Sequence, residues 1–189
     1  MTGKPHGAGK SSIDLMDVNA LMQRLIVRPD MTMLDLGCGE GNYTLAAAER
    51  LEPGAEIIAA DLWQEGIERL AAKAREKGLD FIRTVHVDAA GPLPVEDESV
   101  DAALMATVFH DLVHGGSHQG ALAELSRVLR PGGALAIVEF KVMDGPPGPP
   151  AHVRIGPDDL SAMISPAGFT ENERLDAGEH LYLSIFVRS

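Results

Sequence analysis

One short segment, residues 33–44, constrains the fold more than any other part of the chain: Met-Leu-Asp-Leu-Gly-Cys-Gly-Glu-Gly-Asn-Tyr-Thr. Its first residues are mostly apolar, as in a strand buried on both faces. Gly37, Gly39 and Gly41 follow, and they lack the Cβ atoms that would hold a ligand away from the main chain. We expect a helix from about Asn42 to Leu51, whose N-terminus would direct N–H groups and a positive dipole end to the same place. The segment therefore predicts a strand, a tight turn and a helix that together receive a negatively charged group.

The spacing of the glycines separates two classes of nucleotide-binding turn. Dinucleotide-binding proteins favour G-x-G-x-x-G, in which the third glycine lets the helix approach the strand beneath a pyrophosphate. Here that position is Asn42, and the glycines instead alternate after Asp35, as Asp-Leu-Gly-Cys-Gly-Glu-Gly. This arrangement resembles the first motif of the class I S-adenosylmethionine-dependent methyltransferases. An NAD(P)-dependent oxidoreductase would share the fold, but the glycine spacing opposes it.

Further motifs follow in the order that such a fold requires. Asp61 ends the apolar run 56–61, 20 residues beyond Gly41, where a carboxylate can accept hydrogen bonds from both hydroxyls of a ribose. Asp88 ends the run 81–88, and the resemblance implies that it receives the adenine amino group. Residues 96–106 and 129–138 match the fourth and fifth strand motifs of the family. The resemblance covers about residues 11–189 and implies cofactor contacts from Asp35, Gly37, Cys38, Gly39, Gly41, Asp61, Leu62, Asp88, Ala89, Ala106 and Thr107.

The periodicity of apolar residues and the positions of Gly and Pro predict the order of elements. Strands are expected near 32–36, 56–60, 82–87, 100–105, 133–139, 168–174 and 181–187, and helices near 18–27, 42–51, 63–77, 117–129 and 157–165. Alternation of strand and helix through the first five strands predicts a parallel sheet covered on both faces. The connection 175–180 is too short for a crossover helix, so the final strand should run antiparallel. We therefore predict a doubly wound, seven-stranded Rossmann-like α/β sheet, mostly parallel with an antiparallel last strand.

Composition indicates one domain and excludes several partners. A chain of 189 residues with 45% apolar content suits a single domain over 11–189, with residues 1–10 disordered. Cys38 is the only cysteine, which excludes an intrachain disulfide and favours a reducing compartment. No apolar run approaches about 18 residues, so we expect no membrane span and a cytoplasmic location. The net charge is −12 and the basic residues are scattered, so nucleic acid is not expected as a partner, whereas a small neutral or cationic molecule is compatible.

A histidine-rich segment, residues 107–118, directly follows the fourth strand at the mouth of the expected crevice. His110 and Asp111 are the candidate catalytic residues, because histidine titrates near neutral pH and a carboxylate can orient it. The alternative is that His110 lines the pocket without transferring a proton. His110, His114 and His118 also suggest a metal, but Gly115-Gly116 interrupts the helix that would align them, so no metal is expected.

Two other segments bear on the site. The loop 144–150, Asp-Gly-Pro-Pro-Gly-Pro-Pro, has few backbone donors and should be extended and stiff. It is either a rigid spacer or a wall of the acceptor pocket together with His152 and Arg154. Residues 11–27 carry apolar side chains partly at helical spacing, so part of this segment should be core, while its early part could fold over the cofactor as a lid.

The resemblance narrows the acceptor by exclusion. The Asn-Pro-Pro-aromatic signature of enzymes that methylate exocyclic amino groups is missing, since Ala106-Thr-Val-Phe109 follows the fourth strand. Methylation of arsenic would need several thiols, and Cys38 is the only cysteine, so arsenic is not expected as the acceptor. The chain is similar to small stand-alone methyltransferases grouped loosely with the quinone-biosynthesis type, which implies a small-molecule O-, N- or C-acceptor and S-adenosylmethionine as cofactor. A non-catalytic module that binds the cofactor is the second interpretation, and the oligomeric state stays open.

Overall fold

The computed structural model describes residues 9–52 and 54–189, so most of the expected disordered segment lies outside the described residues. The strands are β1 (Thr32–Leu36), β2 (Glu56–Asp61), β3 (Ile82–His86), β4 (Val100–Ala106), β5 (Leu129–Phe140), β6 (Phe169–Asp176) and β7 (Leu181–Arg188). The α-helices are α1 (Val18–Leu25), α2 (Asn42–Ala48), α3 (Gln64–Glu76), α4 (Phe109–His114), α5 (His118–Val128) and α6 (Pro157–Ile164). Short 3-10 turns are η1 (Ile13–Leu15), η2 (Ala151–Val153) and η3 (Ser165–Ala167).

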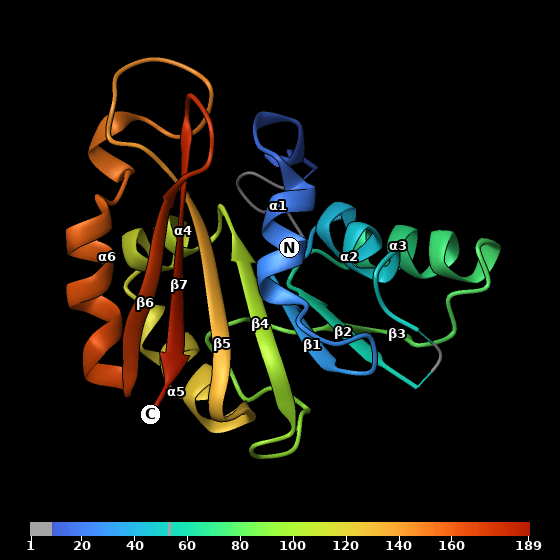
Figure 1. Cartoon of the computed structure of the whole chain (residues 1–189). Coiled ribbons are helices and arrows are strands. Elements are labelled where there is room, and N and C mark those ends of the chain that lie inside the picture. The colour runs from blue at the N-terminus through green and yellow to red at the C-terminus, as the bar shows by residue number, and fades with distance from the viewer. Residues whose placement is uncertain (1–8, 53) are drawn as a thin grey trace.

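All seven strands form one sheet, in the order β3-β2-β1-β4-β5-β7-β6 (Figure 1). The pairs β1–β2, β2–β3, β1–β4 and β4–β5 are parallel, and β7 runs antiparallel to both β5 and β6. The predicted fold class is therefore confirmed. The strand order reverses between β1 and β4, and in such sheets ligands bind beyond the carboxyl ends of the strands at this reversal.

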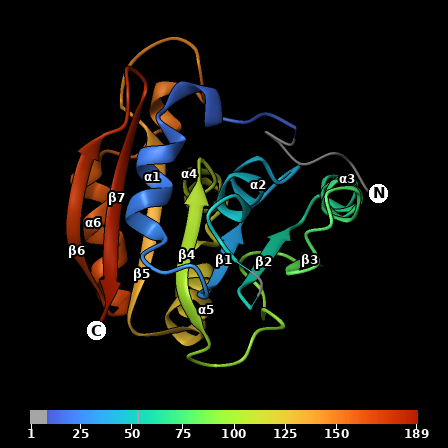
Figure 2. The same ribbon diagram turned by 45° about the vertical axis from the view of Figure 1, so that its right-hand side comes forward.

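Helices cover both faces of the sheet (Figures 1 and 2). On one face, Leu21 and Ala47 from α1 and α2 pack with β-strand residues such as Ala102 and Leu104. On the other face, residues of α4, α5 and α6 pack with the alternate strand positions, such as Ala103. Since successive strand residues point to opposite faces, a strand buried on both faces needs a continuous apolar run. This is why the strand motifs could be found from hydrophobicity alone.

The expected alternation of strand and helix is wrong between β3 and β4. Residues 87–99, all of them described, contain turns and bends but no helix. Pro92 and Pro94 each remove a backbone donor there, which opposes a helix. Side chains of α5 hold the connection instead: the Arg127 guanidinium donates to the carbonyls of Val95 and Leu93 at 2.8 and 3.0 Å. The chain thus crosses between parallel strands without a helix.

Several boundaries also differ from expectation. The structure contains α4, which was not predicted, because six residues are too few to show a helical period in the sequence. α2 ends at Ala48 and α1 at Leu25, each earlier than predicted. β5 begins at Leu129, because the Arg-Pro-Gly-Gly segment forms an irregularity in the strand: Val100 pairs with Leu129, and the next pair joins Ala102 to Ala134. In the part of the chain that the structure describes, no helix is long and apolar enough to cross a membrane.

Candidate functional site

The glycine turn joins β1 to α2, and the structure requires glycine at its three positions for different reasons. All three have positive φ, at +84° for Gly37, +56° for Gly39 and +79° for Gly41. A Cβ at Gly37 would lie 2.5 Å from Val108 Cγ2, and one at Gly41 would lie 2.2 Å from Leu70 Cδ1. A Cβ at Gly39 would meet nothing within 4 Å. The open space that ligand access would require is therefore present at Gly39, whereas Gly37 and Gly41 make room for other parts of the protein.

Asp35 lies beneath this turn. Its side chain is almost fully buried, and Thr44 Oγ1 in α2 donates to Asp35 Oδ2 at 2.5 Å. Burial raises the pKa of Asp35 to about 7, although the hydrogen bond from Thr44 opposes the rise and the charge of Asp61 adds to it. The carboxyl group therefore ties β1 to the first turn of α2 from below, and in this conformation it does not open into the cleft.

Asp61 connects the turn to the end of β2. Its Oδ2 accepts from the backbone N–H of Gly39 at 2.8 Å, and its Oδ1 accepts from the N–H of Trp63 at 2.7 Å. A carboxylate offers about four lone-pair sites, so both oxygens keep the capacity to accept a further hydrogen bond. The side chain is half-buried at the edge where the strands end. Asp61 thus shapes the turn, and its contact with a ribose stays a prediction.

The residues expected around the adenine lie along the same edge, at the ends of β2 and β3. Leu62 is 53% exposed, and its carbonyl is hydrogen-bonded to His86 Nε2 at 3.0 Å. Asp88 is exposed, and its Oδ1 accepts from the N–H of Ala90 at 2.9 Å. Ala89 packs partly against the core. The arrangement provides an apolar surface beside an exposed carboxylate.

A cleft of about 60 Å³ lies over the glycine turn. It is lined by Gly9, Lys10, Ser11, Ser12, Gly37, Cys38, Gly39, Glu40, Asn42, Tyr43, Ala106 and Thr107. The structure thus brings predicted residues from the glycine turn and from the end of β4 to one place, together with an N-terminal segment. Sites for small molecules usually measure about 300–1,000 Å³, so this cleft is smaller than such sites, and residues 9–12 form part of its lining.

Hydrogen bonds hold the N-terminal segment over the cleft. Ser12 Oγ lies 2.9 Å from Tyr43 OH and 3.2 Å from Thr107 Oγ1. Burial raises the pKa of Tyr43 to about 12, so its hydroxyl stays protonated. Thr107 has a φ of +56°, which is rare for a β-branched residue and concentrates at functional sites. Ser12 and Tyr43 were not among the predicted site residues, because their meeting joins positions 31 residues apart.

Cys38 lies in the same turn, and burial raises the pKa of its thiol above the ordinary value. A thiol that stays protonated is a poor nucleophile. Cys38 therefore contributes volume to the wall of the cleft and offers no reactive group.

His110 is 5% exposed at the start of α4, and its orienting partner differs from the expected one. Glu139, fully buried near the end of β5, has its Oε2 2.7 Å from His110 Nδ1, and its Oε1 accepts from the His110 N–H at 3.0 Å. Asp111 Oδ1 is 3.7 Å from His110 Nε2, beyond hydrogen-bond distance. The expectation that Asp111 orients His110 is therefore corrected in favour of Glu139. One signal was present in the sequence: a charged residue inside an otherwise apolar strand is rarely buried without a partner.

The pKa of His110 reflects opposing influences. Burial, the largest, lowers it, but the hydrogen bond and charge of Glu139, with a contribution from Asp111, outweigh burial and raise the pKa above 6.5. With Nδ1 bonded to Glu139, Nε2 is the nitrogen left to exchange a proton.

The proline-rich loop 144–150 is organised by Arg154. This buried guanidinium donates to four carbonyls, those of Lys141, Gly145, Pro147 and Pro149, at 3.1, 2.6, 2.7 and 2.8 Å. Its charged group is thus used to fix the loop, which favours the interpretation of a rigid structural segment over a wall in which Arg154 faces a ligand.

The three histidines considered for a metal are divided between two helices, since α4 ends at His114 and α5 begins at His118. Across residues 9–52 and 54–189, no group of three or more His, Cys, Asp or Glu side chains is arranged to hold a metal ion.

Comparison with known proteins identifies the family. The family model described as "Methyltransferase domain" matches residues 34–137. The chain is 31% identical over 141 residues to nocamycin O-methyltransferase from Saccharothrix syringae, covering 72% of this chain and 46% of that protein. It is 38% identical over 108 residues to demethylmenaquinone methyltransferase from Thermus thermophilus, covering 57% of this chain and 46% of that protein. The chain thus spans about half the length of these curated relatives.

A solved structure agrees with the fold. The crystal structure of a SAM dependent methyltransferase from Aquifex aeolicus superposes with a TM-score of 0.86 at 23% identity, covering 94% of this chain and 93% of that one. The match to the family model extends from β1 into β5 and so includes the glycine turn. The resemblance found in the sequence motifs is thereby confirmed: the chain belongs to the class I S-adenosylmethionine-dependent methyltransferases.

Proposed function

We propose that this chain binds S-adenosylmethionine over the glycine turn and transfers its methyl group to a small-molecule acceptor. The observation that carries the proposal is the open space at Gly39, next to the carboxylate of Asp61. Gly37 and Gly41 also leave room for Val108 and Leu70, whereas no described atom lies within 4 Å of the place that a Cβ at position 39 would occupy. The positive φ already favours glycine at position 39, and the open space in addition gives a ligand access to the main chain.

The residues around the turn suit an adenosyl group. Asp61 accepts from the ribose hydroxyls with its remaining lone pairs, Leu62 covers the adenine, and Asp88 accepts from the adenine amino group. Asp35 and Thr44 support the turn from below. Ser12 and Tyr43 close the cleft and keep water out during transfer. These roles extend the predictions from the sequence, with Asp35 moved from ligand contact to support.

When bound, the cofactor supplies a methyl carbon on a positively charged sulfur, which the lone pair of the acceptor attacks while the sulfur leaves with the bonding electrons. The protein holds the two molecules in line, which can supply most of the rate. An acceptor that carries a proton also needs a base. We assign this role to Nε2 of His110, with Glu139 holding Nδ1 and stabilising the imidazolium that forms.

A matched pair of glycine variants tests the cofactor site. Gly39→Ala and Gly78→Ala both place an alanine at positive φ, +56° and +67°, with no neighbour within 4 Å. Both should therefore lose similar conformational stability, about 1–2 kcal/mol. Only Gly39→Ala places a methyl group in the cleft, so calorimetry should show at least about tenfold weaker binding of S-adenosylmethionine for this variant and unchanged binding for Gly78→Ala. Equal affinities in the two variants would contradict the site, and binding of NAD with similar affinity would favour an oxidoreductase.

Turnover separates an enzyme from a binding module. Wild-type protein is incubated with a methyl-labelled donor and a metabolite extract, and transfer of label to a small molecule is expected. Gly39→Ala serves as the matched control and should transfer much less. If the wild type binds the donor and labels nothing in extracts that support other methyltransferases, the non-catalytic interpretation is favoured.

A further inference from the structure

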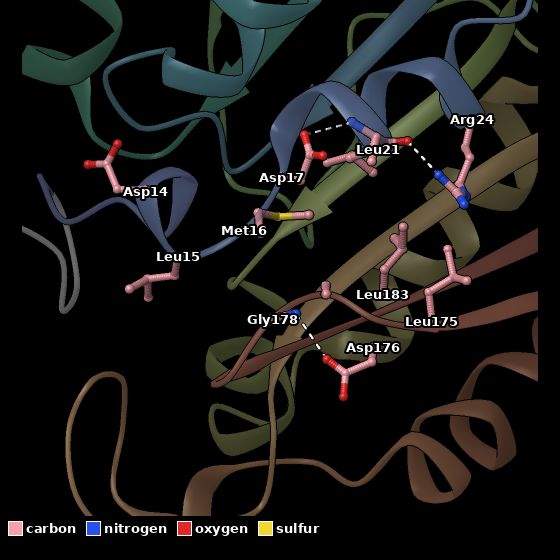
Figure 3. Close-up of a pocket in the computed structure, with 12 residues that line it drawn as sticks. Asp14, Leu15, Met16, Asp17, Leu21, Arg24, Leu175, Asp176, Gly178 and Leu183 are labelled. Carbon is pink, nitrogen blue, oxygen red and sulfur yellow. Dashed lines mark hydrogen bonds between the residues drawn. The ribbon is translucent and has the colours of Figure 1, made fainter.

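A second and larger hollow lies beside the N-terminal helix. This groove, about 500 Å³ in volume, runs between η1 and α1 on one side and the β6–β7 hairpin on the other (Figure 3). Its apolar lining comes from Leu15, Met16 and Leu21 on the first side and from Leu175, Ala177 and Leu183 on the second. The volume falls in the range of small-molecule sites, about 300–1,000 Å³. The volume of the groove is thus comparable to that of such sites, whereas the volume of the cleft over the glycine turn is smaller.

The polar residues of the groove are mainly acidic. Asp14, Asp17 and Asp176 contribute three carboxylates to its lining. Among the described residues that line the groove, Arg24 is the one basic residue, and its Nε is paired with Glu173 Oε1 at 3.3 Å. Lys141 approaches from outside the lining and binds Asp176 at 2.8 Å, and Asp17 Oδ1 accepts from the Ala20 N–H at 3.1 Å as the N-cap of α1. Asp14 and Asp17 are thus the carboxylates of the lining to which the described residues supply no cation. The local excess of negative charge has the same sign as the net charge of −12 and attracts a cation.

The groove is separated from the cleft over the glycine turn by one layer of side chains. Met16 lines the groove, and its Sδ accepts a hydrogen bond from Tyr43 OH at 3.5 Å, while Tyr43 lines the cleft. On the opposite side, the hairpin tip presses against η1, because a Cβ at Gly178 would lie 2.7 Å from the carbonyl oxygen of Leu15. The segment 12–16 is thus a partition held between α2 and the hairpin. Met16 and Tyr43 are the side chains through which this partition contacts both hollows.

We propose that this groove binds the methyl acceptor, and that the acceptor is an amphipathic small molecule with an apolar body and a cationic amine-type group. The apolar body lies against Met16, Leu175 and Leu183, and the cation lies near Asp14 and Asp17. The charged group anchors the molecule, so the atom that receives the methyl group is a different one on the same molecule, directed past Met16 toward the cleft. This inference rests on the proposed function.

The experiment uses a matched pair of ligands, tryptamine and tryptophol, which share an indole body and differ in an ammonium or a hydroxyl group. Calorimetry on the full chain should show tryptamine binding and weaker binding of tryptophol. Asp14→Asn, at an exposed position, should weaken tryptamine about twofold to fivefold and leave tryptophol unchanged. Asp80→Asn removes an exposed carboxylate outside the groove and should change neither affinity.

A second variant tests the location. Ala20→Leu adds volume to the lining of the groove from a half-buried helical position and keeps a strong helix former in α1. It should abolish tryptamine binding while the affinity for S-adenosylmethionine stays within about twofold of wild type. Equal binding of the two ligands, or tryptamine binding that survives Ala20→Leu, would overturn the proposal, as would the absence of tryptamine binding at millimolar concentration. Because cofactor binding is measured in the same samples, loss of that binding in wild type would refute the proposed function separately.

Discussion

Gly41→Ala should destabilise the fold through one clash. The alanine Cβ would lie 2.2, 2.7 and 2.8 Å from Cδ1, Cδ2 and Cγ of Leu70, whereas real Cβ contacts essentially never fall below 3.0 Å. Leu70 is fully buried in a cluster with Cys38, Ala59 and Ile67, so its side chain cannot turn away into solvent. Either the core repacks or the turn shifts.

The magnitude has two parts. An L-residue in the left-handed region costs about 1–2 kcal/mol, and overpacking a core costs about 1–3 kcal/mol. Gly41→Ala should therefore lower the free energy of unfolding by about 2–5 kcal/mol. Gly39→Ala carries only the conformational part, because no atom lies within 4 Å of the place that its Cβ would occupy. The difference between the two variants isolates the clash.

Urea denaturation in the absence of ligand measures both variants. A double-mutant cycle with Leu70→Ala identifies the source: in that background the clash partner is gone, so Gly41→Ala should cost only about 1–2 kcal/mol, with a coupling energy of about 1–3 kcal/mol. If Gly41→Ala costs the same with and without the Leu70 side chain, the packing explanation for this glycine is refuted.

Three further predictions concern pH and dynamics. The pKa of Asp35 is about 7 when folded and near 3.8 when unfolded, so the folded state alone holds a proton between these values and stability falls as pH rises through them. Asp35→Asn should remove this dependence. The difference in unfolding free energy between the variant and wild type should therefore change by up to about 1.4 kcal/mol per pH unit between pH 4 and 7. A difference that stays constant with pH would show that the pKa of Asp35 is not raised in the folded state. If His110 is the base, its raised pKa places the acidic limb of the pH–rate profile above pH 6.5. Glu139→Gln should move that limb to lower pH, and His110→Ala should lower turnover about 10²–10⁴-fold. A limb that Glu139→Gln does not move would show that this pair takes no part in proton transfer. Hydrogen exchange of residues 9–20 should slow when S-adenosylmethionine binds, and identical exchange in both states would leave this segment as a packing element only.

Prediction from sequence succeeded where the cause is local or periodic. The strand, turn and helix around residues 33–44 follow from apolar residues and glycines that are neighbours in the chain. The antiparallel β7 follows from a connection that is too short for a crossover. Prediction from sequence failed for the connection 87–99, which contains no helix and is held by hydrogen bonds from the Arg127 side chain.

The sequence alone indicated the family and the succession of strands along the chain, because each depends on residue type and spacing within a few tens of residues. Only the tertiary structure decided which carboxylate orients His110, since Glu139 lies 29 residues away, on β5, whereas His110 lies in α4. It also decided which glycine faces open space and which make room for Val108 and Leu70. The position of Ser12 over the cleft and the groove beside Met16 are also visible only in the tertiary structure. These contacts depend on how strands pair and helices cross, and no local pattern of residues encodes the distance between side chains that meet only after folding.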